Sequence, residues 1–167
     1  MGEQLTKKDV ELIEQEIEHR KLVVRKEAIE AVKEARAHGD LSENFEYHAA
    51  KRDKNKNESR IRYLEKMLRT AEVISDESKE DEVGMNNTVT LYFEEDDEED
   101  TYRIVTSIRG NSLKNLVSIE SPLGKALLGK KQGERVYIPV NEENGYYVVI
   151  RKIEKTGDDD SDTIRSY

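Results

Sequence analysis

Two long stretches of the sequence carry apolar residues at the spacing of an α-helix. In the first, residues 6–36, apolar side chains recur every three or four positions, at Ile13, Ile17, Val24, Ala28, Ala31 and Ala35. Arg20 occupies the one skipped place, and neither Pro nor Gly interrupts the stretch before Gly39. Thr6 followed by Asp9 resembles a capping pair at its start. The pattern predicts one continuous helix with a narrow apolar seam.

The second stretch runs from about Ser42 to Ile74 and follows heptad spacing. Its seam consists of Tyr47, Ala50, Lys54, Asn57, Ile61, Leu64, Leu68 and Ala71. Two of these positions, Lys54 and Asn57, are polar and weaken the middle of the seam. Their simplest interpretation is that the side chains snorkel to water and set the register.

The two predicted helices fold onto each other about residue 40 or 41. The seams then pair Ala35 with Tyr47, Ala31 with Ala50, Ala28 with Lys54, Val24 with Asn57, Ile17 with Leu64 and Ile13 with Leu68. Residue numbers in every pair add to 81 or 82, as an antiparallel hairpin with a tight turn requires. Because alanines line the seam near the turn, we expect a slender tip over residues 38–44.

The second half of the chain has the short alternating pattern of β-strands. An acidic run at residues 75–82 separates it from the helices. The predicted strands are 88–93, 102–108, 116–119, 135–140 and 146–153, with one short helix at 122–128. We therefore predict an α+β chain: an antiparallel coiled-coil hairpin over residues 1–75, a linker at 76–86, a small antiparallel-sheet domain with one helix at 87–155, and a disordered acidic tail at 156–167.

Composition limits the size of the core and the kinds of site. Charged residues make up 39% of the chain and hydrophobic residues only 35%. The absence of cysteine excludes disulfides and thiolate metal sites, and no apolar run approaches the roughly 20 residues that span a bilayer. With no signal peptide recognisable, we expect a cytoplasmic protein with no membrane partner. His19, His38 and His48 are too scattered for a closed zinc site.

Charge is distributed unevenly around a net value of −9. Residues 51–69 contain eight basic and three acidic side chains, a local balance of +5. Residues 94–100 are seven consecutive acids, which we interpret as a solvated hairpin loop. The chain is thus expected to present opposite signs to different partners.

The predicted turn concentrates the candidate chemistry. Gly39 suits a left-handed cap that ends the first helix. Asp40 and Glu43 have the spacing of a capping box for the second helix, with Ser42 as a competing N-cap. The same spacing also places two exposed carboxylates on one side of the tip, where they could share Mg²⁺, a hard cation that keeps its other positions for water or phosphate. Residue chemistry leaves both interpretations open.

Two motifs resemble the GreA/GreB family of transcript-cleavage factors. They are EARAHGDLSENFEYHAAK at residues 34–51 and SIESPLGKALLGKKQG at residues 118–133. The resemblance implies a monomer whose coiled coil enters the secondary channel of bacterial RNA polymerase. It further implies an FKBP-like C-terminal domain that docks at the channel rim, with Ser121, Pro122, Leu123 and Gly124 as the docking residues.

The resemblance also implies a division of roles along the hairpin. Asp40 and Glu43 would reach the polymerase active centre, stabilise its second Mg²⁺ and orient a water that attacks the phosphodiester of backtracked RNA. Gly39, Ser42 and Asn44 would shape the tip. A basic patch would guide the nascent RNA 3′ end, formed by Lys51, Arg52, Lys54, Lys56 and Arg60. The protein would hold no cofactor of its own, and would stimulate polymerase rather than act as an enzyme.

Three alternatives bear on this interpretation. A related protein could occupy the channel and inhibit polymerase without cleavage, but the complete GDLSEN motif favours cleavage. A prolyl isomerase is disfavoured because the sequence offers no evident apolar proline pocket. The segment from Arg60 to Leu64 looks more like the GreB branch and the remainder like GreA, which leaves the cleavage length open.

Overall fold

The computed structural model describes residues 2–39, 44–157 and 163–164. The chain divides into two compact units, one formed mainly by Asp9–Glu72 and the other by Gln4–Lys8 with Val73–Ser166. A two-residue strand, β1 (Gln4–Leu5), pairs with β2 (Glu72–Val73), a short pairing that the sequence pattern does not predict.

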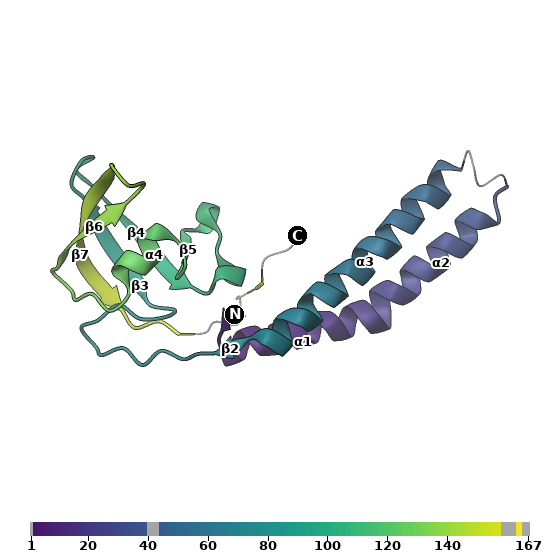
Figure 1. Cartoon of the computed structure of the whole chain (residues 1–167), viewed down its shortest axis with the longest axis horizontal. Helices are drawn as coiled ribbons and strands as arrows, with labels where there is room; N and C mark the ends of the chain where they lie inside the picture. Colours follow the sequence, from purple (N-terminus) through teal and green to yellow (C-terminus); the bar gives the residue numbers. More distant parts are fainter. Residues whose placement is uncertain (1, 40–43, 158–162, 165–167) are drawn as a thin grey trace. The chain divides into compact units, whose positions relative to one another are not determined.

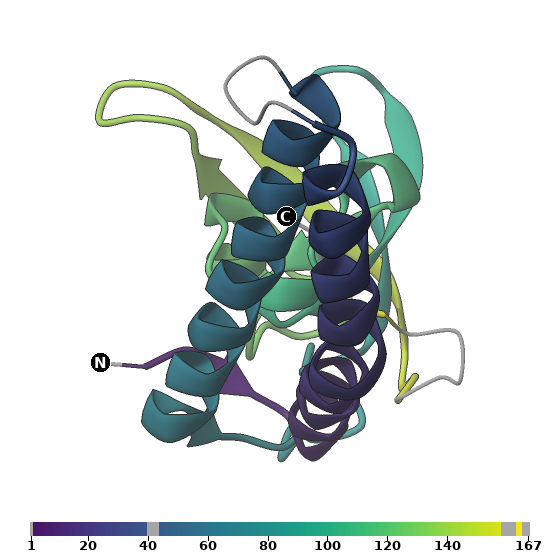
Figure 2. The same ribbon diagram turned by 90° about the vertical axis from the view of Figure 1, so that its right-hand side faces the viewer.

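The first unit is the predicted helical hairpin. One rod is formed by α1 (Lys7–His19), the π-helical turn η1 (Arg20–Val24) and α2 (Arg25–Arg36). The other is α3 (Phe45–Thr70), which lies beside the first in both views (Figure 1, Figure 2). Ion pairs Lys21–Glu65 and Arg25–Glu58 show that residue numbers rise along one rod as they fall along the other. The antiparallel hairpin is confirmed.

The buried seam follows the prediction at the base of the hairpin and departs from it towards the tip. Ile13, Ile61 and Leu64 are buried, as predicted. Ala31 is exposed, however, and its neighbour Val32 is partly buried instead. The physical cause is η1, where Arg25 N–H donates to Arg20 O, five residues back rather than four. An extra residue in a turn shifts the helical phase beyond it, which brings Val32 to the seam in place of Ala31, while Ala28 and Ala35 keep their predicted places.

The second unit is a curled five-stranded sheet with one helix. The strands run in the order β5-β4-β3-β7-β6, and the helix is α4 (Pro122–Leu127). Their bounds are β3 (Thr88–Phe93), β4 (Glu98–Val105), β5 (Leu116–Ser118), β6 (Arg135–Pro139) and β7 (Gly145–Glu154). The predicted strands and helix are confirmed within a few residues, with one exception in direction. β5 runs parallel to β4, because the connection between them carries the chain back to the level of Arg103 before β5 begins. This connection contains two 3₁₀ turns, η2 (Ser107–Arg109) and η3 (Ser112–Lys114).

Alternation along the strands builds the core of the second unit. Inward-facing residues of three adjacent strands pack against Leu127 of α4 in one cluster. They include Val89, Leu91, Val136, Ile138, Val148 and Ile150. Intervening residues of β6 are exposed, as the period-two pattern predicts.

The acidic run is less of a loop than predicted. Only residues 94–97 form the turn between β3 and β4, and Glu98, Glu99 and Asp100 pair with β3 as strand residues. Strand pairing continues from Phe93 opposite Glu98, so the backbone hydrogen bonds outweigh the low strand propensity of the acids. Asp97 takes a positive φ of 51° and accepts a hydrogen bond from the Tyr92 hydroxyl at 2.7 Å, which fixes the turn.

A lysine holds the acidic linker against the sheet domain. Lys155, directly after β7, donates from Nζ to Ser78 Oγ at 2.7 Å and to Lys79 O, Glu82 O and Asn87 Oδ1, each at 2.8 Å. Gly84 leaves room for this arrangement, because a Cβ there would lie 2.0 Å from Ser78 Oγ. None of the helices in the described part of the chain is long and apolar enough to cross a membrane.

Candidate functional site

The tip of the hairpin is described on both sides of the candidate carboxylates. The first rod is described as far as Gly39 and α3 from its N-cap Asn44 onwards, whereas Asp40, Ser42 and Glu43 lie outside the described residues. Gly39 has a φ of +117°, the positive value that its predicted capping role requires. A Cβ at Gly39 would meet nothing within 4 Å, so the requirement there is conformational rather than steric.

Asn44 joins the two helix ends at the tip. Its Oδ1 accepts a hydrogen bond from Tyr47 N–H at 3.0 Å, which makes it the N-cap of α3. Its Nδ2 donates to Ala35 O at 2.6 Å, a carbonyl in the last turn of α2. The predicted N-caps, Asp40 or the competing Ser42, are therefore wrong for this helix. Asn44 takes the cap, so helix capping does not account for the Asp40 carboxylate.

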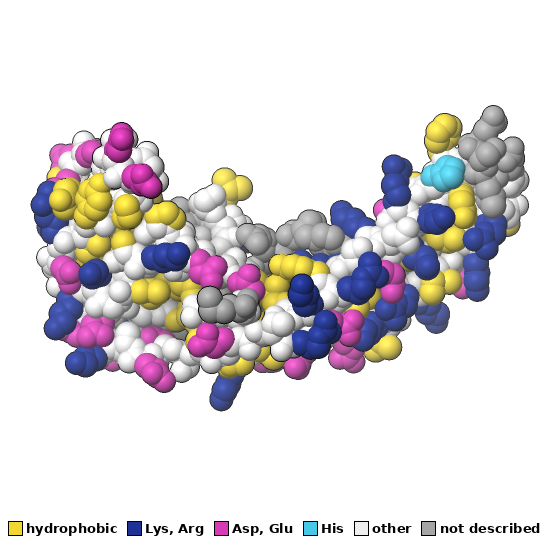
Figure 3. All heavy atoms as spheres, viewed as in Figure 1, with side chains coloured by type: hydrophobic (Ala, Val, Ile, Leu, Met, Phe, Trp, Pro, Cys, Tyr) yellow, Lys and Arg dark blue, Asp and Glu magenta, His cyan; other side chains and the backbone are white. Residues whose placement is uncertain are grey.

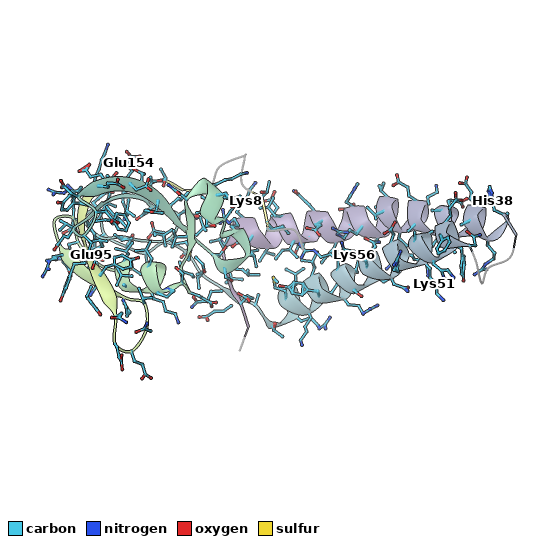
Figure 4. The ribbon with its side chains drawn as sticks, turned by 90° about the horizontal axis from the view of Figure 1, so that it is seen from above. Lys8, His38, Lys51, Lys56, Glu95 and Glu154 are labelled. Carbon is cyan, nitrogen blue, oxygen red and sulfur yellow. The ribbon has the colours of Figure 1, made fainter. Side chains whose placement is uncertain are left out.

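Aromatic and basic side chains surround this junction. The Arg36 guanidinium lies 5.7 Å from the centre of the Tyr47 ring, and a hydrogen bond from Arg36, followed by the charge of Lys51, lowers the pKa of the Tyr47 hydroxyl. Phe45, the first residue of α3, is 85% exposed. His38 lies beyond the end of α2 (Figure 4). The described tip thus presents both basic side chains, Arg36 and Lys51, and acidic ones, Glu34 and Glu46, on either side of the position where the sequence places two carboxylates.

Four of the five predicted patch residues lie at the surface of the hairpin, and the fifth lies inside it. Lys51, Arg52 and Lys56 are exposed and Lys54 is partly buried, all on α3. Figure 4 shows Lys51 and Lys56 on this helix. Lys and Arg side chains are spread over the visible face of the hairpin (Figure 3). Arg60 is only 4% exposed, because its Nε donates to Glu16 Oε2 at 2.9 Å inside the hairpin. Arg60 is therefore a correction to the predicted patch: it is an internal residue.

The predicted docking residues lie at the start of α4. Ser121 is its N-cap and accepts from Gly124 N–H at 3.0 Å, and Pro122 occupies the first turn. Ser121, Pro122 and Leu123 line a cavity of about 540 Å³ whose walls are mostly apolar, including Leu116, Val117, Ile138, Pro139 and Val140. The sequence offered no evident proline pocket, and it gave no sign of this mostly apolar cavity either. Gly124 is buried, and a Cβ at this position would lie only 2.0 Å from Ser118 O. The absence of a side chain therefore lets α4 approach β5.

The described residues form no cluster of metal-binding side chains. Among residues 2–39, 44–157 and 163–164, no three His, Asp or Glu side chains gather closely enough to hold a metal ion. Asp40 and Glu43, which lie outside these residues, offer oxygen donors of the kind that Mg²⁺ prefers. Two carboxylates leave most of the octahedral positions of Mg²⁺ open, which suits a site completed by another molecule.

Glu16 is a structural residue that the sequence pattern did not single out, and its partner is Arg20, the polar residue in the skipped place of the first seam. Arg20 Nε donates to Glu16 Oε2 at 2.6 Å, and Arg20 Nη1 donates to Asn57 Oδ1 at 3.0 Å. The predicted partner of Asn57 was Val24, one turn away. The available signal was the charged residue in the skipped place of the first seam.

Comparison with known sequences gives matches along nearly the whole chain. Residues 3–73 match the family described as transcription elongation factor, N-terminal, and residues 77–155 match the family described as transcription elongation factor, GreA/GreB, C-term. The chain is 42% identical over 149 residues to the transcription elongation factor GreA of Macrococcus caseolyticus, covering 89% of this chain and 94% of the relative. It is 44% identical over 155 residues to GreA of Streptococcus pneumoniae, covering 91% and 95%.

A solved structure also resembles the chain. GreA factor homolog 1 (Gfh1) of Thermus thermophilus is 26% identical, covers 92% of this chain and 99% of its own, and superposes with a TM-score of 0.42. At that score the superposition bears on neither the arrangement of the two units nor the site.

Proposed function

Because this chain belongs to the GreA/GreB family of transcription elongation factors, we propose that it enters the secondary channel of bacterial RNA polymerase and stimulates cleavage of the RNA 3′ end in backtracked complexes. The observation that carries the proposal is the tip itself. A hairpin clamped by Asn44 presents the motif GDLSEN at its end, with Asp40 and Glu43 not required to cap α3.

The hairpin has the dimensions for this role. Its α3 helix has 26 residues, which corresponds to roughly 39 Å at about 1.5 Å per residue. Small side chains line the seam near the tip, where Ala35 is buried and Ala28 and Ala50 are partly buried. A slender rod of this kind can bring two carboxylates into a narrow channel without a bulky domain around them.

At the tip, Asp40 and Glu43 supply negative charge and oxygen donors. Mg²⁺ held between these carboxylates and polymerase would polarise a phosphoryl oxygen and lower the pKa of a bound water. The two side chains would accept hydrogen bonds from that water and so orient it towards the phosphodiester. They have no surface with which to hold RNA in line, so the chain is a stimulating factor and polymerase performs the cleavage.

The remaining surfaces have separate partners. Lys51, Arg52, Lys54 and Lys56 attract the extruded RNA 3′ end by charge, an attraction that salt screens. The apolar cavity beside Ser121, Pro122 and Leu123 receives an apolar segment of polymerase at the channel rim. The alternative is a channel-binding inhibitor that does not stimulate cleavage. The presence of both carboxylates favours stimulation.

A cleavage assay on a backtracked complex tests the proposal. Labelled RNA should shorten from its 3′ end when factor, polymerase and Mg²⁺ are all present, and faster than with polymerase alone. Omission of polymerase should abolish cutting. RNA hydrolysis by the factor alone would overturn the proposed mechanism. If the factor binds the complex but slows, or leaves unchanged, the intrinsic RNA cleavage by polymerase, it is an inhibitor instead.

A further inference from the structure

A buried polar layer crosses the middle of the hairpin. Asn57 and Arg60 of α3 are 3% and 4% exposed, although both have polar side chains. They face Glu16 and Arg20 of the first rod. Buried polar groups are costly unless they are hydrogen-bonded, so a layer of this kind restricts the arrangements that a helix pair can adopt.

Asn57 binds both the side chain and the backbone of a single residue. Its Oδ1 accepts from Arg20 Nη1 at 3.0 Å, and its Nδ2 donates to Arg20 O at 3.2 Å. A side chain that contacts a backbone carbonyl recognises one position along the helix, whatever residue stands there. Arg20 O also accepts the N–H of Arg25, the hydrogen bond that defines the π-helical turn η1. Asn57 therefore meets the first rod at the turn where its phase changes.

Glu16 lies between two guanidinium groups. Arg60 donates to it from Nε at 2.9 Å and from Nη2 at 3.3 Å, and Arg20 donates from Nε at 2.6 Å. Burial raises the pKa of the Glu16 carboxyl, but the hydrogen bonds and charges of Arg60 and Arg20 outweigh it and hold that pKa below its ordinary value. Displacement of α3 by one turn would separate these partners and leave charged groups inside the hairpin.

The apolar side chains on either side of the layer discriminate poorly between registers by themselves. Towards the tip they belong to small residues such as Ala28, Ala35 and Ala50. Towards the base they are aliphatic, as at Ile13, Ile61 and Leu64. Apolar side chains of similar size pack nearly as well after a shift of one turn, whereas a polar layer does not.

We propose that Asn57, with Glu16, Arg20 and Arg60, is a positioning layer that holds the hairpin in one register and so places the tip carboxylates for cleavage. The functional half of this inference rests on the proposed function, and the register half does not. A one-turn shift of α3 moves its N-terminus by about 5.4 Å relative to the first rod, further than a metal site tolerates.

Pulsed electron paramagnetic resonance measures the register directly. The chain has no cysteine, so Lys26→Cys and Asp53→Cys, at two exposed positions on opposite rods between the layer and the tip, carry spin labels at unique sites. The label distance should form one narrow population. Asn57→Leu should broaden or split it, and Asn55→Leu, the same change at an exposed site of the same helix, should not. If Asn57→Leu alone fails to fold, a fourfold variant takes its place, because it replaces the whole layer by an apolar seam. Its changes are Glu16→Leu, Arg20→Leu, Asn57→Leu and Arg60→Leu.

The same variants are then assayed for cleavage at saturating factor. We expect Asn57→Leu to lower the maximal stimulation at least tenfold, with the half-saturating concentration changed less than about twofold, since docking surfaces are untouched. An unchanged narrow distance in the folded variants overturns the register role, and a broadened distance with wild-type stimulation overturns the positioning role. If the wild-type chain itself fails to stimulate cleavage, the proposed function fails, and the distance measurement still decides the register.

Discussion

Asn44 shows how one side chain can build the tip. It caps α3 through Oδ1 and ties α3 to Ala35 O through Nδ2. Asn44→Asp keeps the capping oxygen and loses the donor, whereas Asn44→Ala loses both. We predict that Asn44→Ala lowers the free energy of unfolding by about 1–2 kcal/mol, and that Asn44→Asp lowers it less. Urea unfolding followed by circular dichroism measures both, with exposed Asn55→Ala as the control.

Glu16 makes the hairpin sensitive to acid. Its lowered pKa means that the folded state favours the carboxylate, so its contribution to stability is complete above the ordinary value of 4.5 and is lost as the pH falls through the lowered value. Glu58, Asp76 and Glu94 also have lowered pKa values, so the wild-type curve alone is ambiguous.

We therefore predict the outcome of a comparison with Glu16→Gln. At neutral pH the variant should be less stable by about 1–3 kcal/mol, because two arginines lose a charged acceptor. Below pH 4.5 the two stability curves should converge. Thermal unfolding across this pH range measures the difference, and curves that stay parallel would contradict the assigned role.

At the scale of elements, sequence periodicity predicts most of the architecture. Alternation in β3, β6 and β7 and the two helical seams all led to the correct elements, because burial on one face imposes those periods. The π-helical turn could not be predicted in this way. The segment Arg20–Val24 contains neither Gly nor Pro, so nothing in the sequence marks the extra residue there. A regular helical period then assigns Ala31 to the seam in place of Val32. The family resemblance likewise placed Arg60 in an exposed basic patch, although Glu16 holds it inside the hairpin.

Deletion tests the account of this turn. Removal of Leu22, which is 65% exposed within η1, should convert the turn to regular α-helix and keep the seams on both sides in phase. Removal of the exposed Glu30 from α2 should rotate the tip half by about 100° instead. We predict that the first deletion changes the free energy of unfolding by less than about 1 kcal/mol and that the second costs several, because Val32 and Ala35 leave the seam. Equal losses in both variants would contradict this assignment.

For the whole molecule, the linker is more ordered than its acidic composition suggested. Lys155 donates to four oxygens, three of them within the linker, a contact between distant segments that no local pattern reveals. We predict that Lys155→Met increases cutting by a glutamate-specific protease within residues 76–82 roughly tenfold. This factor corresponds to a decrease of about 1.4 kcal/mol in the free energy of local opening. Lys152→Met, on exposed Lys152 of β7, is the control and should leave the rate unchanged.

For the candidate site, the sequence predicts which residues take part but not how they are arranged. Asp40 and Glu43 came from a motif and lie outside the described residues, while the structure contributes the clamp at Asn44 and the cavity beside Ser121. Spacing along one chain could not separate a capping box from a cation site, because both place carboxylates three residues apart. The observed N-cap of α3 decides against the first.

The central claim is that the carboxylates of Asp40 and Glu43 act in cleavage. Its most direct test is the rate of RNA cleavage by backtracked polymerase saturated with the double variant Asp40→Asn, Glu43→Gln, beside Glu46→Gln on an exposed glutamate of α3. We predict a loss of about 100-fold or more for the double variant, since each 1.36 kcal/mol of lost transition-state stabilisation is tenfold. Helix content and polymerase affinity should stay close to wild type, and Glu46→Gln should stimulate normally. Wild-type cleavage by the folded, polymerase-bound double variant would contradict the claim.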